Sequence, residues 1–233
     1  MNVLITGATK GIGKAVALNM AANGHHLALC ARNGNDLAQL KKEIILQYPA
    51  IHVFIKTTNC AIKEEVYAFA DEALGQYKQI DVLVNNVGVF NLGLLLDEED
   101  NTLENDMKIN LYSAYYLYKK LAPIMRELKN GFIFNMCSVA STTSIINAGS
   151  YCVTKAALLS LNNIMREEMM PHHVKVTAIL PGSTLTNSWE GTSVSPDEFI
   201  KPEDVALAID QIMKMSFGAN VDQIVIMPIH GQF

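Results

Sequence analysis

The chain opens on Asn2-Val3-Leu4-Ile5-Thr6-Gly7-Ala8-Thr9-Lys10-Gly11-Ile12-Gly13. A short run of aliphatic and β-branched residues leads into a turn with glycines at 7, 11 and 13. After a strand, such glycines let the backbone turn sharply, approach a pyrophosphate closely and begin a helix whose amino end attracts anions. The stretch predicts a strand, a phosphate-binding turn and a helix, although taken alone it also fits an ordinary strand-to-helix turn.

The alternation of strand and helix continues along the chain. Aliphatic runs bounded by turn residues predict strands at residues 2–6, 26–30, 51–57, 82–86, 132–137, 174–180 and 223–227. Apolar residues at three- and four-residue spacing predict helices at residues 12–23, 36–46, 63–74, 109–128, 150–170 and 202–215. Nearly unbroken apolar strands suit a parallel sheet that is covered on both faces. We therefore expect an α/β protein with a doubly wound, parallel, seven-stranded sheet, the Rossmann fold.

Size and charge limit the classes of function. The chain has 233 residues, half of them hydrophobic, which is enough for one substantial core, so we expect a single domain over residues 1–233. The formal net charge is −5 and no basic block is present, which argues against a nucleic-acid partner. The uncharged stretch 131–154 is too polar to span a membrane. A strand that begins at Asn2 leaves no room for a signal peptide.

Cysteine and histidine spacing argues against disulfides and metals. Cys30, Cys60, Cys137 and Cys152 form no CxxC pair, so we expect reduced thiols and a cytoplasmic protein. The histidine pairs at 25–26 and 172–173 have no carboxylate or cysteine at ligand spacing, so we expect no metal.

Tyr151 and Lys155 stand one helical turn apart, so their side chains share a face of the predicted helix. A nearby ammonium favours the phenolate, so we expect Lys155 to lower the pKa of Tyr151 from its usual value of about 10. Tyrosine would then be a proton donor that works near neutral pH.

With these motifs the chain resembles the short-chain dehydrogenase/reductase family. The matching residues, in family order, are Thr6-Gly7-x-x-x-Gly11-Ile12-Gly13, Asn85-Asn86-Val87-Gly88, Asn110, Ser138, Tyr151-x-x-x-Lys155 and Pro181-Gly182. The resemblance spans nearly the whole chain and implies hydride transfer between a nicotinamide and a carbonyl or secondary alcohol. In its catalytic set Tyr151 donates the proton, Ser138 binds the substrate oxygen, Lys155 bonds the nicotinamide ribose, and Asn110 positions a water that leads to solvent.

The resemblance also implies a dinucleotide site. Its residues are Gly7, Thr9, Lys10, Gly11, Ile12, Gly13, Arg32, Asn59, Cys60, Asn86, Gly88, Tyr151, Lys155, Pro181, Gly182, Thr184 and Thr186. Asn59 and Cys60 would contact adenine, and Thr186 the carboxamide. The family usually has Asp where this chain has Asn59, and Ala where it has Val87.

Residues after the second strand bear on the choice of cofactor. An acidic residue there holds the ribose hydroxyls of NAD, whereas arginine accommodates the 2′-phosphate of NADP. Arg32 stands at that place, and Lys10 lies in the glycine turn, so we expect NADP(H). Asp36 is an alternative ribose ligand that would favour NAD, although an acidic residue also suits a first helical turn.

The segment of about 183–200 lacks periodicity and is rich in Ser and Thr, as expected of a lid that closes over the cofactor. Trp189 either anchors this lid or faces the substrate. The run 90–96 and Val139, Ala140 and Asn147 are candidates for the border of the substrate pocket, with core packing as the alternative.

The leading interpretation is an NADPH-dependent carbonyl reductase that acts on a small molecule or an acyl thioester, most similar to the 3-oxoacyl-(acyl-carrier-protein) reductases. The signature Pro-Gly-Phe-Ile-x-Thr of that branch appears here as Pro-Gly-Ser-Thr-Leu-Thr at 181–186. The alternatives are an NAD-dependent alcohol dehydrogenase of the same family and a catalytically silent dinucleotide-sensing protein. The resemblance further implies a homotetramer or homodimer, with exposed tyrosines at 112, 115, 116 and 118 as interface candidates.

Overall fold

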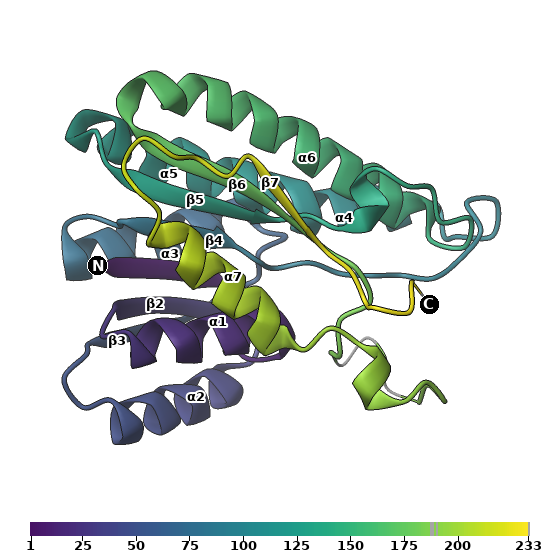
Figure 1. Cartoon of the computed structure of the whole chain (residues 1–233), viewed down its shortest axis with the longest axis horizontal. Helices are drawn as coiled ribbons and strands as arrows, with labels where there is room; N and C mark the ends of the chain where they lie inside the picture. Colours follow the sequence, from purple (N-terminus) through teal and green to yellow (C-terminus); the bar gives the residue numbers. More distant parts are fainter. Residues whose placement is uncertain (187–188, 190, 233) are drawn as a thin grey trace.

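The computed structural model describes residues 1–186, 189 and 191–232. Seven strands form one parallel sheet in the order β3-β2-β1-β4-β5-β6-β7 (Figure 1). The strands are β1 (Asn2–Thr6), β2 (His26–Ala31), β3 (Val53–Thr57), β4 (Val82–Asn85), β5 (Gly131–Met136), β6 (Val174–Pro181) and β7 (Gln223–Ile226). The predicted Rossmann fold is confirmed, and every predicted strand exists within two residues of its predicted ends.

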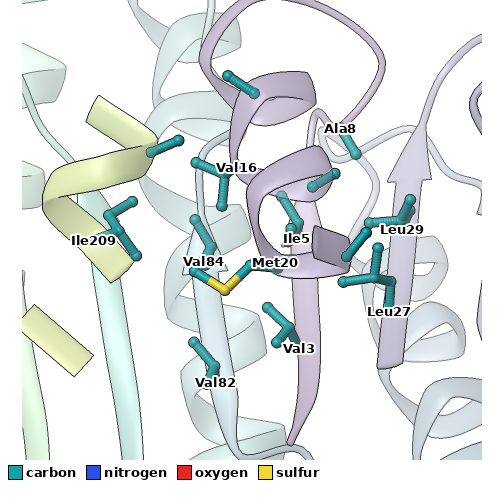
Figure 2. Close-up of a cluster of buried hydrophobic side chains, with 14 of the residues drawn as sticks. Val3, Ile5, Ala8, Val16, Met20, Leu27, Leu29, Val82, Val84 and Ile209 are labelled. Carbon is teal, nitrogen blue, oxygen red and sulfur yellow. The ribbon is translucent and has the colours of Figure 1, made fainter. Parts of the chain in front are cut away.

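Helices cover both faces of the sheet. One face carries α1 (Gly11–Ala22), α2 (Gly34–Gln47) and α7 (Pro202–Met213). The other carries α3 (Lys63–Tyr77), α5 (Ser113–Leu128) and α6 (Gly149–Met169). Figure 2 shows Val3 and Ile5 of β1 packed with Val16 and Met20 of α1. Leu4, between them, belongs to the core on the opposite face, which is why this strand reads as an unbroken apolar run.

The sequence pattern missed the start of one long helical segment. Helix α4 (Thr102–Met107) runs through a π-helical turn, η1 (Lys108–Tyr112), directly into α5. The periodicity indicated a helix only from residue 109, because Asp106 and Asn110 are polar residues at buried positions of this segment. A π-helical turn inserts a residue and often marks a functional position, here that of Asn110.

The predicted lid has an ordered base. Residues 187, 188 and 190 of the 183–200 segment lie outside the described residues. Thr184 and Ile200 form a parallel bridge, and the amide of Leu185 donates to the carbonyl oxygen of Ile200 at 2.8 Å. A short 3-10 turn, η5 (Pro196–Glu198), precedes the returning arm. The two ends of the lid are therefore held together where it joins the sheet.

Candidate active site

The predicted site residues converge at the carboxyl ends of the strands. They surround a cavity of about 1280 Å³ that extends from Arg32 and Asn59 at one end to Tyr151 and Trp189 at the other. Every predicted catalytic or cofactor-binding residue lines it except Gly13 and Asn110. Gly13 packs beneath the glycine turn and Asn110 lies behind the cavity wall, so both shape the site without facing it.

The glycine turn follows β1 as predicted. Gly7 and Gly11 have φ values of +65° and +50°, a left-handed conformation that glycine adopts without strain. A Cβ on Gly13 would lie 2.2 Å from the carbonyl oxygen of Gly7, so only glycine permits this close approach. No side chain caps the amino end of α1, which leaves its first amide groups able to bind an anion. The turn therefore fits the phosphates of a dinucleotide.

Asn86 locks the glycine turn to the neighbouring strand. Its Nδ2 donates to the carbonyl oxygens of Thr6 and Gly7 at 2.9 and 3.1 Å. In return, the Oγ1 of Thr6 accepts hydrogen bonds from the amides of Asn86 and Val87, both at 3.0 Å. Val87, which departs from the family pattern, packs against the core beneath α3 and α5. The larger side chain is accommodated without loss of these contacts.

The adenine end of the cavity is built on β2 and β3. Arg32 and Asp36 both line it, and Arg32 is exposed. The side chain of Asn33 caps α2 by accepting from the amides of Asn35 and Asp36. Asp36 thus lies in the first turn of α2, where a negative charge stabilises the helix dipole, so its position has a structural explanation.

Asn59 and Cys60 also lie at this end of the cavity. The side-chain oxygen of Asn59 accepts from the amide of Ala61 at 3.1 Å, while its own amide donates to Glu65 at 2.6 Å. Asn59 therefore holds this turn through its side-chain oxygen and its backbone amide. Burial, with a hydrogen bond to Cys60, raises the pKa of the Cys30 thiol well above its usual value, which makes that thiol unreactive.

Tyr151, Lys155 and Ser138 meet at the other end. Ser138 follows β5, and its Oγ accepts from the amide of Ala140 at 3.1 Å, which leaves its hydroxyl hydrogen to donate elsewhere. Tyr151 and Ser138 line the cavity together, and Ser138 interacts with the phenol of Tyr151. The ring of Phe90 stands edge-on to that of Tyr151, with 4.8 Å between centroids. Serine, tyrosine and lysine thus face one space, as the sequence predicted.

One electrostatic prediction is wrong. Burial raises the pKa of Tyr151 to about 12, and the hydrogen bond from Ser138 only partly opposes this rise. Burial also lowers the pKa of Lys155 to about 8. The Nζ of Lys155 donates to the carbonyl oxygen of Met136 at 2.7 Å and lies 5.7 Å from the centre of the Tyr151 ring. Desolvation therefore decides the pKa of Tyr151, Lys155 does not offset it, and Tyr151 keeps its proton at neutral pH.

Asn110 connects the catalytic helix to the turn that follows β4. Its Oδ1 accepts from the amide of Val89 at 2.8 Å, and its Nδ2 donates to the carbonyl oxygen of Val89 and to Thr154. Thr154 in turn donates to the carbonyl oxygen of Tyr151 at 2.8 Å. Thr154 was not singled out in the sequence, because a threonine within a helix carries no functional signal.

Gln232 is a second residue that the sequence pattern missed. It lines the cavity, and its Oε1 accepts from the amide of Ser183 at 3.0 Å. A Cβ on Gly182 would lie 2.4 Å from that oxygen, so this glycine makes room for the carboxyl-terminal segment. Sequence reasoning had no signal for this contact, because it joins segments that lie far apart along the chain.

The lid crosses the glycine turn. A Cβ on Gly11 would lie 2.9 Å from the methyl group of Thr186, so the start of the lid packs against the glycine turn. Trp189 packs against Phe199, with ring centroids 5.0 Å apart, and also lines the cavity. Trp189 therefore packs within the lid and also lines the cavity, so the structure does not choose between the two roles that the sequence left open.

Comparison with known proteins identifies the family. Residues 1–195 match the family model for short chain dehydrogenases, so the chain belongs to that family. It is 30% identical to a sepiapterin reductase of Chlorobaculum tepidum, with 98% of this chain and 96% of that protein covered. It is 28% identical to a 3-oxoacyl-(acyl-carrier-protein) reductase of Staphylococcus aureus, with 95% and 86% covered.

A solved structure shows the same fold. The alcohol dehydrogenase of Thermococcus sibiricus, complexed with 5-hydroxy-NADP, superimposes with a TM-score of 0.91, 24% identity and coverage of 100% of this chain and 98% of that chain. Within the described residues, no helix is long and apolar enough to cross a membrane. The same residues contain no group of three or more His, Cys, Asp or Glu that could hold a metal ion.

The lowered pKa of Lys155 predicts a pH-dependent stability difference. Below pH 8 the folded protein carries a buried charge at Lys155, whereas the unfolded chain keeps this proton up to about pH 10.5. Folding is therefore penalised below pH 8, and the penalty disappears as the pH rises toward 10.5. The free energy of unfolding of Lys155→Met minus that of wild type should be largest at pH 6–7. This difference should fall as the pH rises from 8 to 10, because the wild type gains stability over that range. Urea denaturation across this range measures it, and a pH-independent difference would contradict the assignment.

Proposed function

We propose that this chain is an NADP(H)-dependent oxidoreductase that transfers a hydride between the nicotinamide and a carbonyl or secondary alcohol. The observation that carries the proposal is the placement of Ser138, Tyr151 and Lys155 at one end of a single cavity whose other end is the glycine turn. Membership of the short chain dehydrogenase family supports the same reaction class.

In the proposed mechanism the chain's own residues handle the oxygen and the proton. When bound, the reduced nicotinamide supplies the hydride to the carbonyl carbon. Ser138 and Tyr151 donate hydrogen bonds to the carbonyl oxygen and stabilise the negative charge that develops on it. Tyr151 keeps its proton at neutral pH because of its raised pKa, so it is able to give that proton to the alkoxide. Lys155, protonated below its pKa of about 8, then stabilises the resulting phenolate.

The preference for NADP(H) is supported by charge at the adenine end. Arg32 is exposed and lines the cavity directly after β2, and Lys10 lines it from the glycine turn. Two cations in this place match the charge of a 2′-phosphate. The acidic candidate Asp36 has its backbone amide engaged by Asn33 in the first turn of α2. An NAD-dependent dehydrogenase remains the alternative that the cofactor experiment tests.

We propose an uncharged ketone with an apolar flank as the substrate, and a 3-oxoacyl thioester as its best candidate. Besides the candidate catalytic and cofactor-binding residues, the cavity lining includes the apolar side chains of Val89, Phe90, Leu92, Ile145 and Trp189 and the amide of Asn147. Leu92, Leu94, Leu95, Leu96 and Ile146 continue this apolar surface outside as exposed side chains. An acyl chain fits such a border better than a sugar, whose hydroxyls would be left without partners.

Tyr151→Phe tests the reaction itself. Removing the hydroxyl takes away the proton donor but not the ring that packs against Phe90, so kcat should fall about 10³-fold while the Kd for NADPH stays within about twofold. NADPH absorbance with a panel of carbonyls that includes acetoacetyl thioesters and sepiapterin measures turnover, and fluorescence titration measures binding. Wild-type protein that binds NADPH but reduces nothing on the panel would instead be a catalytically silent dinucleotide-sensing protein.

Arg32→Ala tests the cofactor assignment. Loss of a charge-assisted hydrogen bond to the 2′-phosphate should raise the Kd for NADPH about 10- to 100-fold and leave the Kd for NADH nearly unchanged. Lys42→Ala, which removes an equal charge from the exposed side of α2, is the matched control and should change neither value. Equal weakening of both dinucleotides by Arg32→Ala would contradict a role in 2′-phosphate binding.

We also propose that the outer face of α5 and α6 joins copies of the chain. Tyr115 of α5 and Ile164 of α6 are exposed, as are Tyr112, which precedes α5, and Met170, which follows α6. The sequence placed Tyr116 and Tyr118 among the exposed tyrosines as well. Tyr118 is instead buried and donates a hydrogen bond to Glu168, and Tyr116 is half-buried. A cytoplasmic location remains a proposal, supported by four cysteines that are all free.

Ile164→Glu tests this interface. The side chain of Ile164 is 55% exposed, so a charge there should leave the fold intact but oppose burial against a second copy. Light scattering after gel filtration should give an oligomer for wild type and a smaller species for the variant. Leu46→Glu, at an exposed position of α2, is the control and should keep the wild-type mass. A monomeric wild type would overturn the proposal.

A further inference from the structure

Residues 90–98, here called the brace, run beside the start of the catalytic helix α6. Gly93 and Ala148 form a parallel bridge, and the amide of Gly93 donates to the carbonyl oxygen of Asn147 at 2.8 Å. The brace follows the Asn86 to Gly88 turn of the cofactor site and leads toward α4. It is therefore a direct connection between the dinucleotide end of the cavity and the residues that precede Tyr151.

Side-chain packing fixes the brace against the first residue of α6. A Cβ on Gly149 would lie 2.5 Å from the Cγ of Leu95. A side chain on residue 149 would therefore clash with Leu95, which packs directly against the backbone of Gly149. At its other end the brace reaches the reacting group, because the ring of Phe90 stands edge-on to that of Tyr151.

The amino end of α6 lacks the usual stabilising groups of its own. Ala148 at the N-cap position has no side chain to accept a hydrogen bond, and the first turn contains no acidic residue. Glu98 supplies an acceptor from outside the helix: its Oε2 accepts a hydrogen bond from the hydroxyl of Ser150. Ser150 is 1% exposed and directly precedes Tyr151. The carboxylate thus places a negative charge at the positive end of the helix dipole.

A buried carboxylate, that of Asp106, ties the brace to α4. The Nδ2 of Asn91 donates to the Oδ1 of Asp106 at 2.8 Å, and Asp106 is 1% exposed. Burial, together with the charge of Glu98, raises the pKa of Asp106 above its usual value. Among the described residues, neither Oε1 of Glu98 nor Oδ2 of Asp106 has a hydrogen-bond partner. Leaving a buried carboxylate oxygen without a partner costs stability, so the placement of these two groups calls for a reason other than stability.

We propose that Glu98 is a positioning residue: by holding Ser150, it fixes the first turn of α6 and with it the hydroxyl of Tyr151 relative to the nicotinamide. The inference rests on the proposed oxidoreductase function. Glu98 touches neither substrate nor cofactor in this role. It acts only through Ser150, so its loss should misplace the proton donor and leave the dinucleotide site as it is.

Kinetics on purified, folded protein test the role. Glu98→Ala should lower kcat about 10- to 100-fold, because small misplacements of a reacting group carry penalties of this size. The Kd for NADPH should stay within about twofold. Glu98→Gln should recover most of kcat, since its amide oxygen still accepts from Ser150. Glu99→Ala, which removes an equal charge from an exposed neighbour, is the matched control and should behave as wild type.

A double-mutant cycle separates positioning from a general structural effect. If Glu98 acts through Ser150, then Ser150→Ala should reproduce the loss in kcat, and the double variant should lose no more than either single variant. A kcat within twofold of wild type for Glu98→Ala would overturn the proposal. A loss of NADPH affinity as large as the loss of kcat would also overturn it. Additive losses of kcat in the Glu98 and Ser150 variants would do the same.

Amide hydrogen exchange gives a readout that does not depend on turnover. The amides of residues 149–152 should exchange faster in Glu98→Ala than in wild type or Glu99→Ala, because the first turn of α6 opens more readily. Equal exchange in all three proteins would overturn the positioning role. Wild-type protein without turnover on any carbonyl would contradict the proposed function alone, and the exchange result would still decide the place of Glu98.

Discussion

The whole site depends on one close approach of backbone to backbone, that of Gly13 to the carbonyl oxygen of Gly7. Because Gly13 has no Cβ, helix α1 begins directly against the end of β1. The side-chain amide of Asn86 then reaches the carbonyl oxygens of both Thr6 and Gly7. This contact joins β1 to β4 at the centre of the sheet. The amino end of α1 is thereby placed beside the turn that leads to the catalytic end of the cavity.

Burial decides the electrostatics of the catalytic end. Lys155 was expected to lower the pKa of Tyr151, yet burial favours the neutral form of both side chains. A phenol that keeps its proton and an amine with a pKa of about 8 are suited to passing a proton rather than to holding charges. The Lys155 hydrogen bond to Met136 fixes the amine against β5, so this pairing is a property of the sheet and the helix together.

The cavity is chemically divided, and this division matters for function. Cations and glycine amides lie at the end formed by β1 and β2, whereas apolar side chains from the brace, the 139–148 segment and the lid surround the other end. Three segments from distant parts of the sequence thus border the end of the cavity where the proposed substrate would bind. A fourth segment, near the carboxyl terminus, contributes Gln232, which accepts a hydrogen bond from the backbone amide of Ser183 at the start of the lid.

The sequence by itself determined the strands of the sheet, the order of the motifs and a set of site residues of which nearly all line the cavity, because glycine geometry, strand periodicity and the spacing of Tyr151 and Lys155 are local properties. It did not determine the pKa of Tyr151, the burial of Tyr118, the helix that begins at Thr102, or the contacts of Gln232 and Glu98. Each of these depends on desolvation or on contacts between segments that are distant along the chain. Only the packed tertiary structure sets how far a side chain is removed from water and which partner it meets there.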